Sequence, residues 1–290
     1  MTGWGLMMYR LRLGANRALT AALVPAILLI SCAATVAPAF AGARQAAPAH
    51  VNALYRISFT ALGDIGYFRF TSNIDGEAYT LSGEAKIKTT IFKYDGTMSS
   101  AGTVPAAYAR PAAYEFRYKQ KALFGKKKAK SLNVAFDPDG VNKVTWVPPE
   151  EPWKKVVPVT PAQLKSVLDP LSGVMALSLG NLAKPCEQRL PIYDGKQRFD
   201  VVFTPSGQAP ETKGDHVCRV HLVPISGHKQ GEGAATVVNG NIEVVLRPVP
   251  KANVIIPFKV TVPTIIGSAV LTSEQVDITM PDQQRIALRR

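Results

Sequence analysis

The sequence contains few residues of the kinds that bind metals or form catalytic nucleophile and base pairs. Its 290 residues include only three cysteines and four histidines, and neither CxxC nor HExxH spacing occurs. The GxSxG sequence of many serine hydrolases is also missing. Because zinc sites need several suitably spaced Cys or His ligands, the sequence predicts no metal site, no cofactor and no catalytic residue.

Long apolar runs are missing after the first part of the chain. None of the later segments approaches the ~20 apolar residues of a membrane-spanning helix. The one long run, residues 18–37, follows three arginines with no acidic residue before it. It is followed by small residues up to Ala41, as in export signals cleaved by signal peptidase. We therefore expect residues 1–41 to be a signal peptide and residues 42–290 to be a single β-rich periplasmic domain.

The same segment permits a second interpretation. The sequence LISC, Leu29–Cys32, has the pattern of a lipobox, in which Cys32 is acylated and anchors the chain to a membrane. The sequence stays apolar after Cys32, however, where a lipoprotein usually turns polar. We favour the soluble exported protein and keep the anchored lipoprotein as the alternative.

Acidic residues are few compared with basic ones. The chain has 34 Lys and Arg against 21 Asp and Glu, a formal net charge of +13. An exported chain does not meet nucleic acid, so we expect no nucleic-acid partner. The charge instead suits anionic partners in the envelope, such as phospholipid head groups or lipopolysaccharide phosphates.

Six lysines cluster around Gly125 at the tip of a predicted hairpin. The cluster has two interpretations, a solvated turn or a contact with an anionic membrane surface. The solvated turn is the favoured one, since charged residues commonly occupy hairpin tips. The candidate contact residues are Lys119, Lys121, Lys126, Lys127, Lys128 and Lys130.

Two of the three cysteines, Cys186 and Cys218, follow the expected signal peptide. In an oxidising compartment two cysteines more often pair than stay free. The alternatives are a reactive thiol or a metal pair. A metal pair would have His216 and His221 as the nearest further ligands, but their spacing does not support it. We expect a disulfide between Cys186 and Cys218.

Period-two alternation of apolar and polar residues recurs along the whole chain, and it is typical of antiparallel strands with one buried face. It occurs around residues 55–60, 79–88, 114–119, 132–136 and 254–262. Between such runs lie pairs of Asp or Asn with Gly, which favour hairpin turns because glycine readily adopts positive φ. These pairs are Asp75-Gly76, Asp95-Gly96, Asp139-Gly140, Asp194-Gly195 and Asn239-Gly240.

Helical patterning occurs in one place, residues 161–180. Thr160 with Pro161 and Gln163 has the pattern of a capping box, and Asp169-Pro170 starts the same pattern again. A proline-rich connection over residues 145–161 precedes it. We expect two short helices here, each with one apolar face toward a sheet.

Three stretches resemble a known family of bacterial exported proteins. YRISFTALGDIGYFRF, DPLSGVMAL and YDGKQRFDVVF are similar, in order and spacing, to domain of unknown function family 3108. The resemblance implies a β-rich periplasmic protein without an established activity, with an open or spiral barrel like that of lipoprotein carrier proteins. It supplies no catalytic residues, and the pair Cys186 and Cys218 departs from the general family pattern.

Together these observations predict a mainly β fold: a single antiparallel curved sheet or incomplete (spiral or open) barrel, with two short helices packed on its concave side. The favoured function is that of a non-enzymatic periplasmic envelope protein. It binds an apolar or amphipathic ligand, such as a lipid or lipoprotein, or a partner protein in the concave face. The alternative is a hydrolase or other enzyme that acts on envelope lipid or glycan. The sequence does not indicate the ligand or the oligomeric state.

Overall fold

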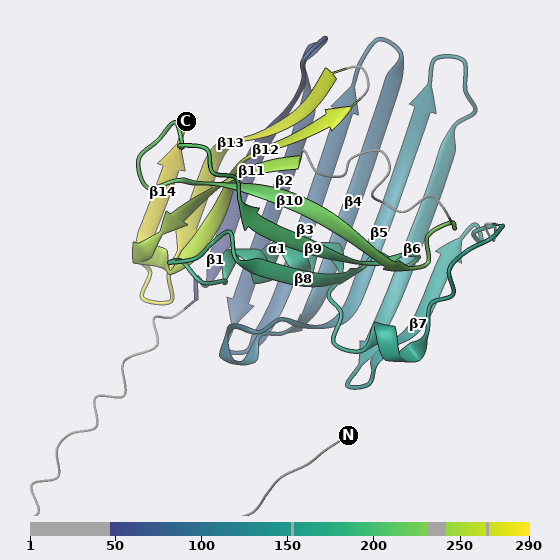
Figure 1. Ribbon diagram of the computed structural model, residues 1–290, viewed down its shortest axis with the longest axis horizontal. Coiled ribbons are helices and arrows are strands. Elements are labelled where there is room, and N and C mark those ends of the chain that lie inside the picture. Colours follow the sequence, from purple (N-terminus) through teal and green to yellow (C-terminus); the bar gives the residue numbers. More distant parts are fainter. Residues whose placement is uncertain (1–46, 152–153, 231–241, 265–266) are drawn as a thin grey trace, which may run out of the picture. The chain divides into compact units, whose positions relative to one another are not determined.

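Strands make up most of the chain. The computed structural model describes residues 47–151, 154–230, 242–264 and 267–290, all within a unit of residues 44–290. In these residues 14 strands form one antiparallel sheet (Figure 1). The strands are β1 (His50–Phe59), β2 (Gly63–Asp75), β3 (Ala78–Lys88), β4 (Phe92–Thr103), β5 (Arg110–Ala122), β6 (Lys128–Asp137), β7 (Gly140–Val147), β8 (Gln188–Tyr193), β9 (Arg198–Pro205), β10 (His216–Ser226), β11 (Ile242–Val249), β12 (Val254–Thr264), β13 (Gly267–Thr279) and β14 (Arg285–Arg289). The expected cleavage site and Cys32 lie outside the described residues.

The strand order follows the chain in two runs that meet at β1 and β13. It reads β7-β6-β5-β4-β3-β2-β1-β13-β12-β11-β10-β9-β8, and β14 pairs with the second half of β13. The junction of the runs extends from the pair His50 and Thr279 to the pair Phe59 and Ala269. Consequently β7 and β8, which follow one another in sequence, lie at opposite ends of the strand order.

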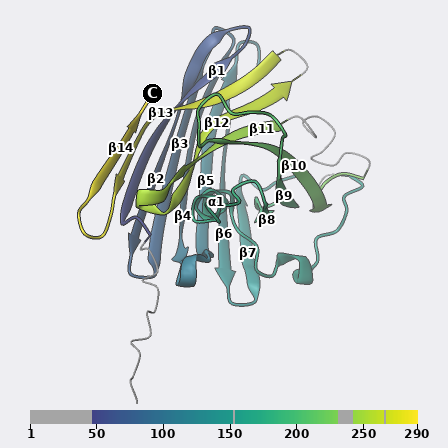
Figure 2. The ribbon, with the colours of Figure 1, turned by 60° about the vertical axis from the view of Figure 1, so that its left-hand side comes forward.

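The sheet curls around one helix, α1 (Pro170–Ser178), which contacts β3 and β4 in one run and β8 and β12 in the other (Figure 2). The two ends of the sheet approach each other where the Trp146 side chain of β7 donates its Nε1–H to the Gly195 carbonyl oxygen, 3.4 Å away, in the turn after β8. Among the described residues no strand ladder joins β7 to β8. The prediction of a curved, open antiparallel sheet is therefore confirmed.

The alternating pattern gives the sheet one buried face. In β3, Tyr79 and Leu81 are buried while Thr80 and Ser82 are exposed. Buried side chains from both runs pack with α1 in the main core, and a second cluster lies among β9, β10, β11 and β12. Since burying a large aliphatic side chain contributes roughly 1.5–3 kcal/mol, the cover that α1 provides is a main source of stability.

Only one of the two predicted short helices forms. Pro161–Leu164 is a single 3-10 turn, η2, which begins with the predicted capping box. Lys165 then returns to extended backbone, and Ser166 has a φ of 54°. Helical backbone is disfavoured before a proline, so Asp169 ends the extended segment and caps α1 instead of continuing a helix from η2.

The predicted hairpin turns are correct for three of the five Asx-Gly pairs and wrong for one. The Asp75-Gly76, Asp139-Gly140 and Asp194-Gly195 pairs lie where β2, β6 and β8 turn back, and each glycine has positive φ. Asp95-Gly96 lies inside β4. A Cβ at Gly96 would lie 2.7 Å from the Tyr94 hydroxyl oxygen, so this glycine makes room for a tyrosine ring. Asn239-Gly240 lies outside the described residues.

Candidate functional site

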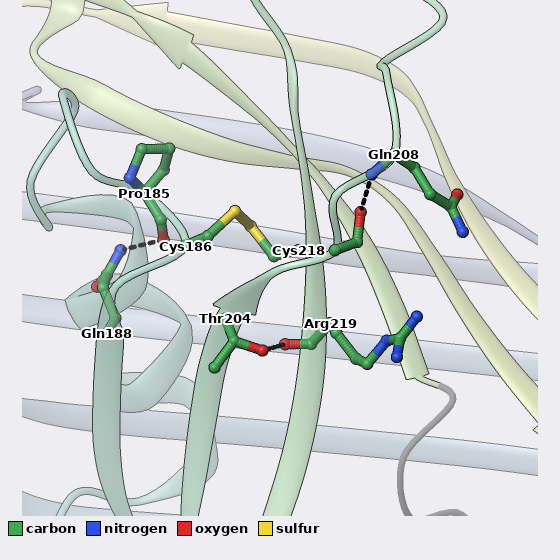
Figure 3. The surroundings of a disulfide bond; sticks show 8 residues. Pro185, Cys186, Gln188, Thr204, Gln208, Cys218 and Arg219 are labelled. Atoms are coloured by element: carbon green, nitrogen blue, oxygen red, sulfur yellow. Dashed lines mark hydrogen bonds between the residues drawn. A yellow bond between two sulfur atoms is a disulfide. The ribbon is translucent and has the colours of Figure 1, made fainter.

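The two cysteines predicted to pair are joined by a disulfide. Cys186 precedes β8 and Cys218 lies in β10, with their Cα atoms 5.3 Å apart (Figure 3). Both belong to the second core cluster, together with Leu246 and Ile255. The bond ties the start of β8 to β10 across β9. It is a buried structural link, of a kind typical of oxidising compartments.

The charged residues between Cys186 and Phe203 hold a hairpin together. The Asp194 carboxylate accepts two backbone N–H groups of its own turn, at 2.9 and 2.7 Å, and burial raises its pKa. Arg189 and Arg198 both pair with the buried Asp200, at 2.6 and 2.5 Å. Asp194 is therefore a turn residue, as the sequence predicted, and the arginines are occupied by Asp200.

Histidines do not form a site with the disulfide or with each other. His216 lies opposite Leu246 and His221 opposite Val202 in the ladder. The neighbouring Asp215 pairs with Arg247 at 2.7 and 2.8 Å. Among the described residues no three His, Cys, Asp or Glu side chains gather as potential metal ligands. In the same part of the chain, no helix combines the length and hydrophobicity needed to cross a bilayer.

A polar network lies at the start of α1, inside the main core. The Asp169 carboxylate accepts the backbone N–H groups of Leu171 and Ser172 and the hydroxyl of Ser100, at 2.9, 3.0 and 2.8 Å. The Tyr79 hydroxyl lies 2.8 Å from the Ser172 hydroxyl, and burial raises the Tyr79 pKa to about 12. All these side chains are buried. The network caps the helix and fixes it on β3 and β4.

Beyond α1 the concave face carries side chains that nothing in the described core covers. Ile87, Phe92, Tyr94 and Tyr118 alternate onto the same face as Tyr79 and Ser100, yet they are only partly buried and belong to neither core cluster. We call these four residues the concave strip. The Tyr94 and Tyr118 rings stack, with centroids 5.9 Å apart. The strip is thus an apolar and aromatic surface inside the curve of the sheet.

The helix contacts β3 at Gly83 and leaves the strip, which lies further along the strands, uncovered. Leu171 of α1 packs on Gly83, where an added Cβ would lie 3.2 Å from the leucine side chain. Gly83 pairs with Met98, and Met98 with Phe116. This row marks the limit of the main core, and the concave strip begins in the next rows toward the ends of β3 and β5.

The six lysines divide between the two faces and the tip of one hairpin, β5–β6. Lys119 and Lys121 alternate onto the outer face of β5, and Lys126 and Lys127 lie in the turn. Lys128 and Lys130 alternate onto the concave face of β6, where Lys130 pairs with Tyr118 in the ladder. The sequence therefore identified one hairpin correctly, but its lysines do not form a single patch.

Lys130 has partners of its own. It pairs with Glu150, which also accepts from Lys196 at 2.9 Å, and it lies 5.8 Å from the centre of the Trp146 ring. These lysines lower the pKa of Glu150, Lys130 most strongly, and Glu150 raises the pKa of Lys130. One carboxylate thus holds two ammonium groups, and the neighbouring Glu151 also acts on Lys130. The exposed positive charge at this margin of the concave face, beside the strip, is that of Lys128.

Two hollows lie outside the concave strip. One of about 560 Å³ lies between the ends of β4, β5 and β6, with Arg110, Phe136 and Val167 in its wall. Another of about 570 Å³ opens on the outer face of the sheet around Asp95 and Lys119. The outer hollow is lined by charges of both signs, and within it Glu84 pairs with Lys86 at 2.8 Å. Neither hollow places a nucleophile beside a base.

A family model described as Protein of unknown function (DUF3108) matches residues 54–273, from β1 to β13. The chain belongs to this family. The match includes α1, the concave strip and both cysteines. No curated protein matches the chain. Among solved structures, the chain is similar to the beta-barrel-like protein of domain of unknown function DUF1849 from Brucella abortus, with 13% identity and a TM-score of 0.47 over 80% of this chain and 98% of that one.

The sequence analysis did not identify the concave strip of this DUF3108 member as a site. Phe92 and Tyr94 precede Asp95-Gly96, which was interpreted as a turn, so neither was placed in a strand. Tyr118 belongs to the alternating run around residues 114–119, whose apolar face the pattern predicts to be buried, whereas the tyrosine is only partly buried. A usable signal is present: Gly83 and Gly96 lie on the inward face of their strands, where glycine leaves room for another group.

Proposed function

We propose that the protein is a non-enzymatic, periplasmic component of the bacterial cell envelope that binds an amphipathic ligand with an acyl chain on the concave strip. One observation carries the proposal: an aromatic and aliphatic surface lies inside the curve of the sheet, outside the packed core, with lysines at one margin. Apolar surface in a concave setting with a few polar groups at its edge is typical of ligand sites.

The chemistry of the strip favours a chain with a negatively charged end. Ile87, Phe92 and the Tyr94 and Tyr118 rings offer apolar surface to a bound chain, and the two tyrosine hydroxyls are the polar groups among them. Lys128 is exposed on the concave face of β6, and Lys130 next to it is held by Glu150. A carboxylate or phosphate at the end of the acyl chain would meet this margin. The resemblance to exported proteins and the disulfide support the placement in the envelope.

Hydrolysis of envelope lipid or glycan is the less supported alternative. The polar groups that converge within the curve are Asp169, Ser100, Ser172 and Tyr79, and all four are buried in the core. A substrate on the concave strip does not reach them. Asp169 is, moreover, occupied by the first N–H groups of α1, which leaves it as a cap rather than a base.

Native mass spectrometry of the protein isolated from the envelope of producing cells tests the proposal. We expect a non-covalent lipid adduct on the wild type that Tyr94→Ala with Tyr118→Ala reduces strongly. The matched control removes two tyrosines outside the strip, Tyr67→Ala with Tyr108→Ala, and keeps the adduct. A wild type without adduct, or equal adducts on both double variants, would contradict the proposal.

A further inference from the structure

We propose that the ends of three neighbouring hairpins form a docking surface for an anionic lipid bilayer. The turns β1–β2, β3–β4 and β5–β6 lie together along one edge of the sheet, at the top of Figure 1. The tip surface, as we name it, consists of four apolar residues and three lysines. These are Leu62, Ile91, Leu123, Phe124, Lys121, Lys126 and Lys127.

The apolar residues of the tip surface are unusually exposed. Phe124 is 98% exposed, Ile91 59%, Leu62 58% and Leu123 55%. Single exposed apolar residues are ordinary on protein surfaces. Four of them on adjacent turns form a group. Two of these turns are also joined by a hydrogen bond, which the Leu123 N–H donates to the Ile91 carbonyl oxygen at 2.8 Å.

The turn that carries Ile91 is held in place by its own hydrogen bonds. The Thr89 hydroxyl accepts the N–H groups of Ile91 and Phe92, at 3.3 and 2.9 Å, and the Thr89 N–H donates to the Phe92 carbonyl oxygen at 2.8 Å. The exposed side chain therefore projects from an ordered turn. Ordered projection reduces the conformational entropy that binding has to overcome.

The charge around the two tied turns has one sign, and at the third turn Asp64, close to Leu62, pairs with Arg56 at 3.2 Å. Residues 85–94 and 117–136, which include both tied turns, contain several lysines and no acidic residue. Lys121, Lys126 and Lys127 are exposed. Two contributions hold proteins at a membrane surface. Apolar side chains enter the head-group region, and lysines are attracted to anionic lipid.

A bilayer fits this surface better than a protein partner or a second copy of the chain. Stable protein interfaces need roughly 20–30 residues on each side, whereas the tip surface is a row of turns with four apolar side chains. A bilayer requires no complementary shape. The inference goes beyond the ligand proposal and does not depend on it, because none of the tip residues belongs to the concave strip.

Co-sedimentation with vesicles tests the docking surface. Wild type is compared with K121Q/K126Q/K127Q, with L123S/F124S and with K143Q/K213Q/K251Q, a charge-matched control whose exposed lysines lie away from the tips. Vesicles contain phosphatidylcholine alone or with phosphatidylglycerol. We expect wild type to prefer the anionic vesicles at low salt and to lose that preference at high salt, where the Debye length shortens to ~3 Å.

Removal of the three tip lysines should weaken binding to anionic vesicles about 100-fold, because each lysine near such a surface contributes a factor of about five. The L123S/F124S variant should weaken it by roughly tenfold, since less apolar surface enters the bilayer. The control should bind as wild type does. Equal binding by wild type and the tip-lysine variant, or no binding by wild type at low salt, would overturn the inference.

A tryptophan at the most exposed tip position gives a second readout, which reports directly whether the tip itself enters the bilayer. In Phe124→Trp, anionic vesicles should shift the added fluorescence to shorter wavelength, because the indole leaves water. A vesicle-bound variant without this shift docks by another surface and contradicts the inference. Concentration-dependent dimers that L123S/F124S abolishes would assign the tips to a second copy and would also contradict it.

Discussion

The two halves of the concave face differ in what covers them. One half, around Tyr79, Leu81 and Ser100, lies under α1 and is buried. The other half, the concave strip, continues the same strands and the same alternation, but no helix of the described residues lies above it. The difference teaches that an inward position in this sheet is not by itself a core position: it becomes one only where another part of the chain covers it, as α1 covers Leu81 or the turn at Gly195 covers Leu132.

The largest predicted effect compares one residue from each half. Leu171→Ala removes the α1 side chain that packs on Gly83 and should lower the free energy of unfolding by about 4 kcal/mol, as expected for a buried leucine. Tyr118→Ala in the strip should cost only about 1 kcal/mol, because its ring is partly exposed. Urea denaturation of both variants measures the difference. Similar losses would mean that the strip is part of the core.

The disulfide should matter for stability and not for the strip. Replacing Cys186 and Cys218 together by alanine should lower the free energy of unfolding by about 3–4 kcal/mol, on the chain-entropy model for the loop that the bond closes. Binding of an acyl probe should stay at the wild-type level, since the bond lies in the second core cluster. Denaturation and probe titration of the same variant check both statements. A loss of binding in a folded variant would link the two regions.

A smaller effect concerns the pH dependence of the covered half. Burial, the dominant influence, raises the pKa of Asp169 in the folded protein above its unfolded value. Its contribution to stability is thus greatest below the unfolded pKa of about 4 and is lost as pH rises through the folded pKa. Asp169→Asn keeps a carbonyl oxygen for the N–H groups of α1 and cannot ionise.

The stability of Asp169→Asn relative to wild type should therefore rise with pH above about 4. Thermal or urea unfolding of both proteins at a series of pH values measures this. A matched control, Asp95→Asn, removes an exposed carboxylate from the outer face of β4. If Asp169→Asn instead becomes relatively less stable as pH rises, the hydrogen bonds to the carboxylate outweigh its burial.

Much of the fold follows from the sequence because alternation and turn residues act locally. The pattern of β3 predicts its inward side chains over the whole strand, and Asp194-Gly195 predicts its hairpin. The helix after Asp169 is also marked by its cap and proline. Only one helix forms, because the steric restriction before Pro170 separates it from the 3-10 turn, and a pattern of spaced apolar residues does not register that restriction.

The candidate site is harder to predict because cover is a long-range property. Tyr79 and Tyr94 are both inward tyrosines, and their local sequences do not differ in a way that sets one under α1 and leaves the other outside the core. The lysines present the same difficulty. Lys128 and Lys126 are two positions apart in sequence, yet one lies on the concave face of a strand and the other in a turn, and only the β5–β6 register separates them.

The most direct test of the account is a titration with cis-parinaric acid, a fluorescent fatty acid, of wild type, Tyr94→Ala with Tyr118→Ala, and Tyr67→Ala with Tyr108→Ala. The account predicts saturable binding by wild type and by the second double variant, and binding roughly tenfold weaker by the first, since two ring surfaces are lost from the site. Equal affinities for all three folded proteins would show that the concave strip does not bind an acyl chain.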